Sequence, residues 1–252
     1  MKRAQNAIRN NLLATLSPQD CALLADSLQS VDFTTGQSLF HPGQDVRYVF
    51  FPGPGTIASL VIGARDGVTT EAALIGTEGA VGGVISEGFK PAFAHGVIQI
   101  GGPGYRLPIA VLSRAKKQSP TLRDHFARYA DCLIAQILQS VECNTIHEFD
   151  ARLARWLLAV QDRIGSDKLH VTQEFIANML GVQRTYTTRV IKRLVKAGAI
   201  TNGRGVVTII SRARLERESC ECYAYLQRHF QRVMPDIYPV YQKPKRVAKS
   251  DA

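Results

Sequence analysis

The sequence lacks the features of membrane, secreted and disulfide-bonded proteins. No apolar run approaches the roughly 20 residues that a membrane-spanning helix needs. The N-terminus is basic but has neither a sustained apolar core nor a small-residue cleavage site, which argues against a secretory signal. The five cysteines are an odd number without framework spacing and suit a reducing cytosol. With 45% hydrophobic and 21% charged residues over 252 positions, we expect a globular cytoplasmic protein with one large domain or two ordinary ones.

The residue patterns of common enzyme and cofactor sites are also missing. The glycine cluster at 79–83 is not followed by a helix or by Lys-Ser/Thr, so it does not predict a phosphate loop. His147-Glu148 begins like a zinc-protease motif, but Ala151 replaces the second histidine. No paired carboxylates or nucleophile arrangement stand out, so we expect no enzyme, no metal ion and no cofactor. The scattered histidines predict structural rather than haem-binding roles, and the cysteines show no iron–sulfur spacing: His41, His95 and His125; Cys21, Cys132, Cys143, Cys220 and Cys222.

Charge is distributed unevenly along the chain. Residues 1–148 hold 12 Lys+Arg and 12 Asp+Glu, whereas residues 149–252 hold 19 and 9, so the whole net charge of +10 lies in the second part. A neutral part joined to a basic part indicates that the second part meets a polyanion, most often nucleic acid.

The order of the expected elements predicts an α+β chain. Short segments rich in Val, Ile and Phe alternate with turn signals such as HPGQD and FPGPG over 31–112, which favours an antiparallel sandwich, barrel or jelly roll. Helices are expected over 119–146 and 149–164, with the domain boundary near 146–150. The first helix carries an apolar stripe typical of packing on a partner: Leu122, Phe126, Ala130, Leu133, Ile137 and Val141.

The segment 169–210 predicts a winged helix-turn-helix. Thr172 can cap a first helix, and Gly181 stands where a tight inter-helix turn needs a positive φ. A second helix is expected over 183–196, and the sequence after it predicts a hairpin with Asn-Gly-Arg-Gly at its tip, the wing.

The second helix of this segment has two unlike faces. At roughly 100° per residue, one side is apolar and comprises Thr187, Val190, Ile191 and Leu194. The opposite side, which we call the basic face, comprises Arg184, Thr185, Thr188, Arg189 and Lys192. These donor-rich side chains suit phosphates and base edges in a major groove.

Beyond the hairpin the sequence predicts one further helix and a basic tail. Ser211 can cap this helix, and Ser219 fills a step in its apolar spacing. Cys222 is then predicted to be a small core residue rather than a ligand. The tail after Met234 contains KPKR and is expected to be mobile and to attract phosphate. The apolar residues that define the helix are Leu215, Cys222, Leu226 and Phe230.

Together these motifs resemble the Crp/Fnr superfamily of bacterial transcription regulators, over roughly residues 17–210. VTQEFIANMLGVQRTYTTRVIKRLVKAGAI is similar to that family's helix-turn-helix, and the strands are similar to its cyclic-nucleotide-binding-type β-roll. The resemblance implies a bacterial, cytoplasmic homodimer that binds a pseudo-palindromic operator and works with RNA polymerase. It further implies a β-roll sensory domain at 1–118, a dimerisation helix at 119–148, a winged helix-turn-helix domain at 149–212, and a C-terminal helix with a mobile tail at 213–252.

The resemblance places the DNA contacts on the two short helices and the wing. Arg184 and Arg189 match the family's recognition-helix arginines, which suit bidentate contact with guanine or phosphate. Thr185 stands where the family often has an acidic residue, so the family's commonest half-site is not expected. The full set of expected DNA-contacting residues is Thr172, Gln173, Gln183, Arg184, Thr185, Thr188, Arg189, Lys192 and Arg204.

The expected effector site departs from the family pattern. Cyclic-AMP-binding members have a Gly-Glu-Leu-Gly turn whose Glu holds the ribose, whereas the matching turn here, from Gly79 to Gly82, reads GAVG. Lys90-Pro91 stands where those members have the Arg-Ser/Thr pair that holds the phosphate. We therefore expect no tight cyclic AMP binding. Gly79, Gly82 and Lys90 remain candidates for an effector that the sequence does not identify.

The sequence thus predicts a DNA-binding transcription regulator with double-stranded DNA and a second copy of itself as partners. The alternative is a ligand-binding regulatory module whose basic C-terminal region docks a protein partner. Salt dependence separates the two, because binding through several phosphates weakens steeply and log-linearly with salt.

Overall fold

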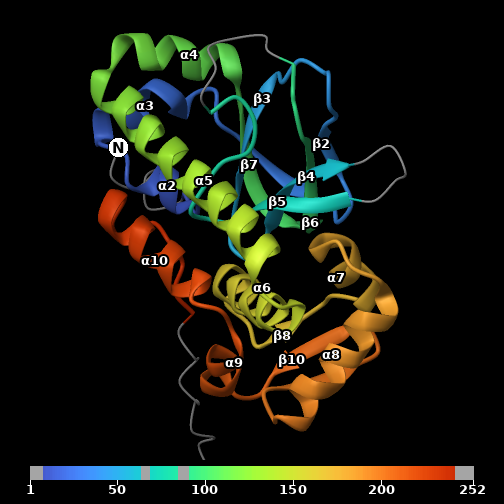
Figure 1. The fold of residues 1–252 in the computed structure, drawn as a ribbon. Coiled ribbons are helices and arrows are strands. Elements are labelled where there is room, and N and C mark those ends of the chain that lie inside the picture. Colours follow the sequence, from blue (N-terminus) through green and yellow to red (C-terminus); the bar gives the residue numbers. More distant parts are fainter. Residues whose placement is uncertain (1–7, 64–68, 85–90, 242–252) are drawn as a thin grey trace, which may run out of the picture.

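The fold was analysed in a computed structural model that describes residues 8–63, 69–84 and 91–241. Figure 1 shows a β-rich N-terminal part, a long helix running across it, and a smaller mixed part below that carries the helix-turn-helix. Lys90 and the KPKR tail lie outside the described residues.

Two antiparallel sheets form the N-terminal part, as the turn-rich sequence predicts. One sheet has the order β1-β7-β3 and the other β2-β6-β4-β5. Phe51, Ile98 and Leu107 are fully buried in the hydrophobic cluster of this part. The strands are β1 (Gln29–Phe33), β2 (Ser38–Phe40), β3 (Tyr48–Pro52), β4 (Ile57–Gly63), β5 (Thr69–Ile75), β6 (His95–Ile100) and β7 (Gly102–Pro108).

Three shorter helices accompany the roll. Ser17 caps α3 by accepting a hydrogen bond from Asp20 N, and Pro18 takes the first helical position, where its missing N–H costs nothing. Asp20 then accepts hydrogen bonds from the hydroxyls of Ser119 and Thr121, which ties α3 to the start of the long helix. The three helices are α2 (Asn11–Ala14), α3 (Pro18–Ala25) and α4 (Ile109–Gln118).

The long helix α5 (Pro120–Ile146) has the expected bounds, and Ser119 caps it. Its predicted apolar stripe packs on the roll from Leu122 to Ile137 but not at Val141. Leu122 and Leu133 are buried, whereas Val141 is 60% exposed. The reason is geometric, because spacings of four outrun the 3.6-residue turn and the stripe drifts around the helix.

The C-terminal part is a winged helix-turn-helix, as predicted. Its three strands form one antiparallel sheet in the order β8-β10-β9. The hairpin of β9 and β10 is the wing. The elements are α6 (Phe149–Ile164), β8 (Lys168–Leu169), α7 (Gln173–Leu180), α8 (Arg184–Lys196), β9 (Ile200–Gly203) and β10 (Val206–Ile209).

The N-terminal and C-terminal parts, which meet in the chain between α5 and α6, share a hydrophobic core. Ile57, Val61 and Leu74 of the roll belong to the same buried cluster as Trp156 of α6 and Ile191 of α8. The helix-turn-helix is therefore packed against the roll in this conformation.

The prediction of a single C-terminal helix from the apolar spacing is wrong. The chain forms two helices, α9 (Arg212–Glu218) and α10 (Cys222–Val233), with Ser219 in an extended conformation between them. The Ser219 hydroxyl donates to Glu216 O, so a side-chain hydrogen bond competes with the helical pattern. After the break α10 runs back beside α5 (Figure 1), where Phe230 is buried in the cluster of the roll.

Among the described residues, none of the helices combines the length and apolarity that crossing a bilayer requires.

Candidate nucleic-acid interface

The turn between α7 and α8 is set by local chemistry. The Thr172 hydroxyl accepts a hydrogen bond from Phe175 N at 3.0 Å and so caps α7. Gly181 ends this helix with φ 65°, a left-handed conformation that a residue with a Cβ adopts only at a cost. The chain then enters α8 within three residues, and this fixes the angle at which α8 leaves the fold.

The two faces of α8 are separated as the sequence predicts. The apolar side is buried in the core and consists of Thr187, Val190, Ile191 and Leu194. On the basic face, Arg184, Thr185, Arg189 and Lys192 are exposed, and Thr188 is half-buried. The structure thus brings the predicted residues to one open side of one helix, and that helix contains no acidic residue.

The two arginines of the basic face are only weakly engaged within the chain. The side chain of Arg184 is 70% exposed and its guanidinium lies 4.0 Å from Glu174, which is equally exposed, so water screens this pair. The guanidinium of Arg189 stacks over the Tyr186 ring with 5.5 Å to the centroid. Both side chains therefore keep hydrogen-bond donors available for an outside acceptor.

Thr188 and Gln173 contact each other instead of pointing independently to solvent. The Thr188 hydroxyl donates to Gln173 Oε1 at 2.6 Å and links α8 to the first turn of α7. The Gln173 amide nitrogen is left as a donor. Gln183, just before α8, is exposed and makes no side-chain capping bond.

A neighbouring arginine holds α8 to the body of the fold. Arg193 pairs with Asp150 of α6 at 2.5 Å, and the Tyr186 ring packs on Phe149 with 5.2 Å between centroids. These contacts orient the helix so that its basic face looks outward.

Arg204 lies at the exposed tip of the wing. The tip turns at Gly205, which has φ 72°. In the antiparallel pair of β9 and β10, Ile200 lies opposite Ile209 and Gly203 lies opposite Val206. The wing therefore presents an exposed cation next to the helix-turn-helix.

The expected effector turn at 79–82 is closed by the chain itself. The Tyr129 hydroxyl of α5 accepts from Ala80 N at 2.9 Å and donates to Ala80 O at 3.0 Å. A Cβ built on Gly79 would lie 2.2 Å from the Tyr129 oxygen, and one on Gly82 would lie 2.8 Å from Tyr48 O. The N–H groups of Gly79 and Val81 are taken by Gly76 O and Phe50 O. These glycines therefore serve close packing of the turn.

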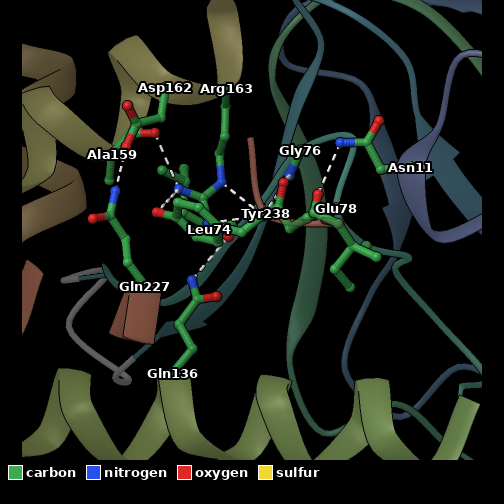
Figure 2. Close-up of polar contacts among 12 residues, drawn as sticks. Asn11, Leu74, Gly76, Glu78, Gln136, Ala159, Asp162, Arg163, Gln227 and Tyr238 are labelled. Carbon is green, nitrogen blue, oxygen red and sulfur yellow. Dashed lines mark hydrogen bonds and ion pairs between the residues drawn. The ribbon is translucent and has the colours of Figure 1, made fainter. Parts of the chain in front are cut away.

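The acidic residue next to this turn is committed to the other part of the chain. Glu78 forms an ion pair with Arg163 of α6 at 2.7 Å, with side chains 2% and 1% exposed. Figure 2 shows the pair, with Gly76 N also donating to the carboxylate and Tyr238 beside the guanidinium. A second carboxylate, that of Glu71 of β5, is half-buried and accepts a hydrogen bond from Trp156 Nε1 at 3.1 Å.

Sequence reasoning missed one group of chemically active side chains. Cys143, His147, Cys220 and Cys222 place their ligand atoms within 4.8 Å of one another, a grouping that the spacing of the cysteines in the sequence did not predict. The signals were a Cys-x₃-His pair at helical spacing and a Cys-x-Cys pair. Their contact across the chain depends on the break between α9 and α10, which the apolar spacing did not predict.

Comparison with known proteins matches this geometry. Residues 151–218 match the Crp-like helix-turn-helix domain. The whole fold is similar to a transcriptional regulator of the Crp/Fnr family from Eubacterium rectale, with 20% identity, TM-score 0.64, and coverage of 86% of this chain and 97% of that one. FixK2 from Bradyrhizobium japonicum has 13% identity and TM-score 0.67, covering 77% and 98%. A transcriptional regulator of the CRP family from Thermus thermophilus has 21% identity and TM-score 0.63, covering 75% and 96%.

None of the curated proteins compared with the chain matches it. The chain contains a Crp-like helix-turn-helix domain, and its fold is similar to that of the Crp/Fnr-family regulators compared above. The resemblance inferred from the sequence is confirmed.

Proposed function

We propose that this protein is a sequence-specific transcription regulator that binds a pseudo-palindromic operator as a homodimer. The observation that carries the proposal is the basic face of α8, which is exposed and free of acidic residues on its own helix. Such a helix reaches base edges in a major groove, because its side chains there are all hydrogen-bond donors or hydroxyls.

Each residue has a role that its environment supports. Arg184 and Arg189 each donate two hydrogen bonds to a guanine or a phosphate, and Thr185 and Lys192 extend the same surface. Thr172, Gln173 and Gln183 lie at the N-terminal ends of α7 and α8, where helix dipoles favour phosphate. Thr188 positions Gln173 through their hydrogen bond. Arg204 contacts the backbone or minor groove from the wing.

A second copy of the chain is the partner that α5 requires. Ile134, Leu138 and Val141 are 45%, 63% and 60% exposed and lie at helical spacing on the side of α5 that faces away from the roll. A matching stripe from a second α5 would bury them as a coiled-coil seam. Two α8 helices related by this two-fold axis would meet half-sites whose centres lie roughly 34 Å apart.

The described part of the expected effector site does not favour cyclic AMP. Tyr129 occupies the space above the turn at 79–82, and Glu78 is engaged with Arg163 rather than open to a ribose. We therefore propose a regulator that does not respond to cyclic AMP. By its class, RNA polymerase is the expected protein partner, and the bacterial cytoplasm is the expected compartment.

Genome-wide occupancy mapping of the tagged protein, followed by salt titration on the recovered site, tests the function. A regulator of this kind yields discrete sites with a two-fold repeat, and its affinity falls log-linearly with salt. Occupancy without a shared sequence, together with a salt-independent weak affinity, would favour the alternative in which the basic region docks a protein.

A further inference from the structure

Four side chains from distant parts of the sequence converge where α5 ends. Cys143 lies in the last turn of α5 and His147 follows at the C-cap, four residues on and therefore on the same side of the helix. Cys220 lies in the break between α9 and α10, and Cys222 is the first residue of α10. All four ligand atoms lie within 4.8 Å of one another.

The spacing of these atoms fits a single tetrahedral metal ion. Cys143 Sγ lies 3.6 Å from Cys220 Sγ, and Cys222 Sγ lies 3.4 Å from His147 Nδ1. Thiolates bound to one zinc ion at about 2.3 Å stand about 3.8 Å apart in a tetrahedron. A multi-iron cluster needs its ligands farther apart than the observed upper limit, so one ion is the better fit.

The surroundings orient the ligands as a metal site requires. The other ring nitrogen of His147, Nε2, lies 3.4 Å from the Glu221 carboxylate, which favours the tautomer that leaves Nδ1 free to bind. Gln139 Nε2 lies 3.0 Å from Cys222 Sγ and donates toward the sulfur. The three cysteines are at most 6% exposed, and the His147 side chain is 16% exposed.

Cations next to the cluster balance thiolate charge. The Nε atoms of Arg152 and Arg155 are buried without a hydrogen-bond partner among the described residues. Cysteine binds a metal ion as the thiolate. Three thiolates around a divalent ion carry one net negative charge, which these guanidinium groups offset.

We propose that Cys143, His147, Cys220 and Cys222 form a Cys₃His zinc site that joins the C-terminal end of α5 to the segment between α9 and α10. Four protein ligands leave no open position, so the ion has a structural role. Its binding fixes the helix-turn-helix domain between its two connections, because α6 begins two residues after His147 and α9 ends two residues before Cys220. The proposal does not depend on DNA binding.

Titration of the chelated, reduced full-length protein with Co²⁺ and then Zn²⁺ tests the site. We expect one Co²⁺ per chain, with the thiolate charge-transfer and tetrahedral d–d absorption bands, and complete displacement by one Zn²⁺. Elemental analysis of the protein as purified without chelator is expected to find one zinc per chain.

Single variants separate ligation from mere presence of thiols. Cys222→Ser and His147→Gln are each expected to abolish or shift the Co²⁺ absorption bands. Both variants are also expected to bind zinc more than 100-fold more weakly than the wild type. Glu221→Gln, which removes only the orienting carboxylate, is expected to weaken it about 10–100-fold. Cys21→Ser is the control, because it removes a thiol of α3 outside the cluster and leaves binding unchanged.

The fold of each variant is checked by circular dichroism and by its unfolding temperature with and without Zn²⁺. We expect zinc to raise the unfolding temperature of the wild type and of Cys21→Ser, but not that of Cys222→Ser. Retention of the Co²⁺ spectrum in a folded Cys143→Ser/Cys220→Ser variant would overturn the proposal. The proposal would also be overturned if the reduced wild type bound neither Co²⁺ nor Zn²⁺. A Cys143–Cys220 disulfide in the protein as purified would not change this conclusion.

Discussion

The basic face of α8 and the turn at 79–82 are the two places where the sequence predicts ligands, and the fold treats them in opposite ways. The basic face keeps its charged side chains exposed, although both of its arginines have a neighbour within the chain. The turn is filled by Tyr129, and its N–H groups are bonded to protein acceptors. The first is an exposed basic surface, and the second is part of the core.

A buried ion pair connects the two regions. Glu78 stands next to the turn and Arg163 lies on α6, the helix that supports the helix-turn-helix. Rotation of the helix-turn-helix domain away from the roll would have to separate these charges. The ion pair between Glu78 and Arg163 therefore holds the roll, with its closed turn, against the domain that carries the exposed basic face.

The largest effect is expected from Glu78→Ala. It leaves the Arg163 guanidinium buried without its partner, so the free energy of unfolding should fall by about 3–5 kcal/mol. Urea denaturation followed by circular dichroism measures this. Glu174→Ala, which removes an exposed partner of Arg184, is the matched control and should change stability by less than about 1 kcal/mol. Equal effects of the two variants would show that the junction contributes no more than a surface pair.

Leu138→Glu tests the apolar side of α5. A charge placed in the proposed seam should weaken the dimer by about 2–4 kcal/mol, since an unpaired buried charge is costly. Light scattering over a range of concentrations gives the dimer dissociation constant. Val240→Glu introduces the same charge at a residue of similar exposure, 64%, beyond α10 and should leave the dimer intact. Dimers of unchanged affinity in Leu138→Glu would place the interface elsewhere.

Removing single arginines from the basic face should have a moderate effect on DNA alone. Arg184→Ala and Arg189→Ala are each expected to cost about 1–3 kcal/mol of binding to the cognate operator, with stability nearly unchanged. Fluorescence anisotropy with labelled operator measures the loss. Arg232→Ala, an exposed arginine of α10, removes the same charge far from α8 and serves as the control. An equal loss of operator affinity in all three variants would show that the basic face contributes only through the net charge of the protein.

The smallest effect concerns the pH dependence of the contact between the roll and α6. Burial raises the pKa of Glu71 above its ordinary value, and hydrogen bonds from Ser59 and Trp156 oppose this shift only in part. The folded state then holds a proton that the unfolded state has lost, so stability falls as the pH rises from about 4.3 to the raised pKa. Relative to Glu71→Gln, the wild type should lose at most about 1.4 kcal/mol per pH unit in this window. Denaturation midpoints that run parallel in the two proteins would contradict the shift.

Local chemistry made much of the fold predictable. Thr172 and Ser211 cap the helices that they were expected to cap, and Gly181 supplies the positive φ of the turn. The two faces of α8 follow from the helical period alone. The residues of the helix-turn-helix could therefore be named from short stretches of sequence, and their contacts with DNA stay predictions.

The rest depended on contacts between distant residues. The pairing of Glu78 with Arg163 and the filling of the turn by Tyr129 each join segments far apart in the chain. The cysteine cluster required the break at Ser219, where a hydroxyl bond to the backbone overrides an apolar spacing that continues through it. Periodicity does not report such competition.

Protection of guanine N7 from methylation on a recovered operator tests most directly the claim that α8 lies in the major groove. The account predicts two protected patches in the major groove, with centres roughly 34 Å apart, that disappear in the Arg184→Ala/Arg189→Ala variant at concentrations where the wild type is bound. Binding without N7 protection, or protection that persists in the double variant, would contradict it.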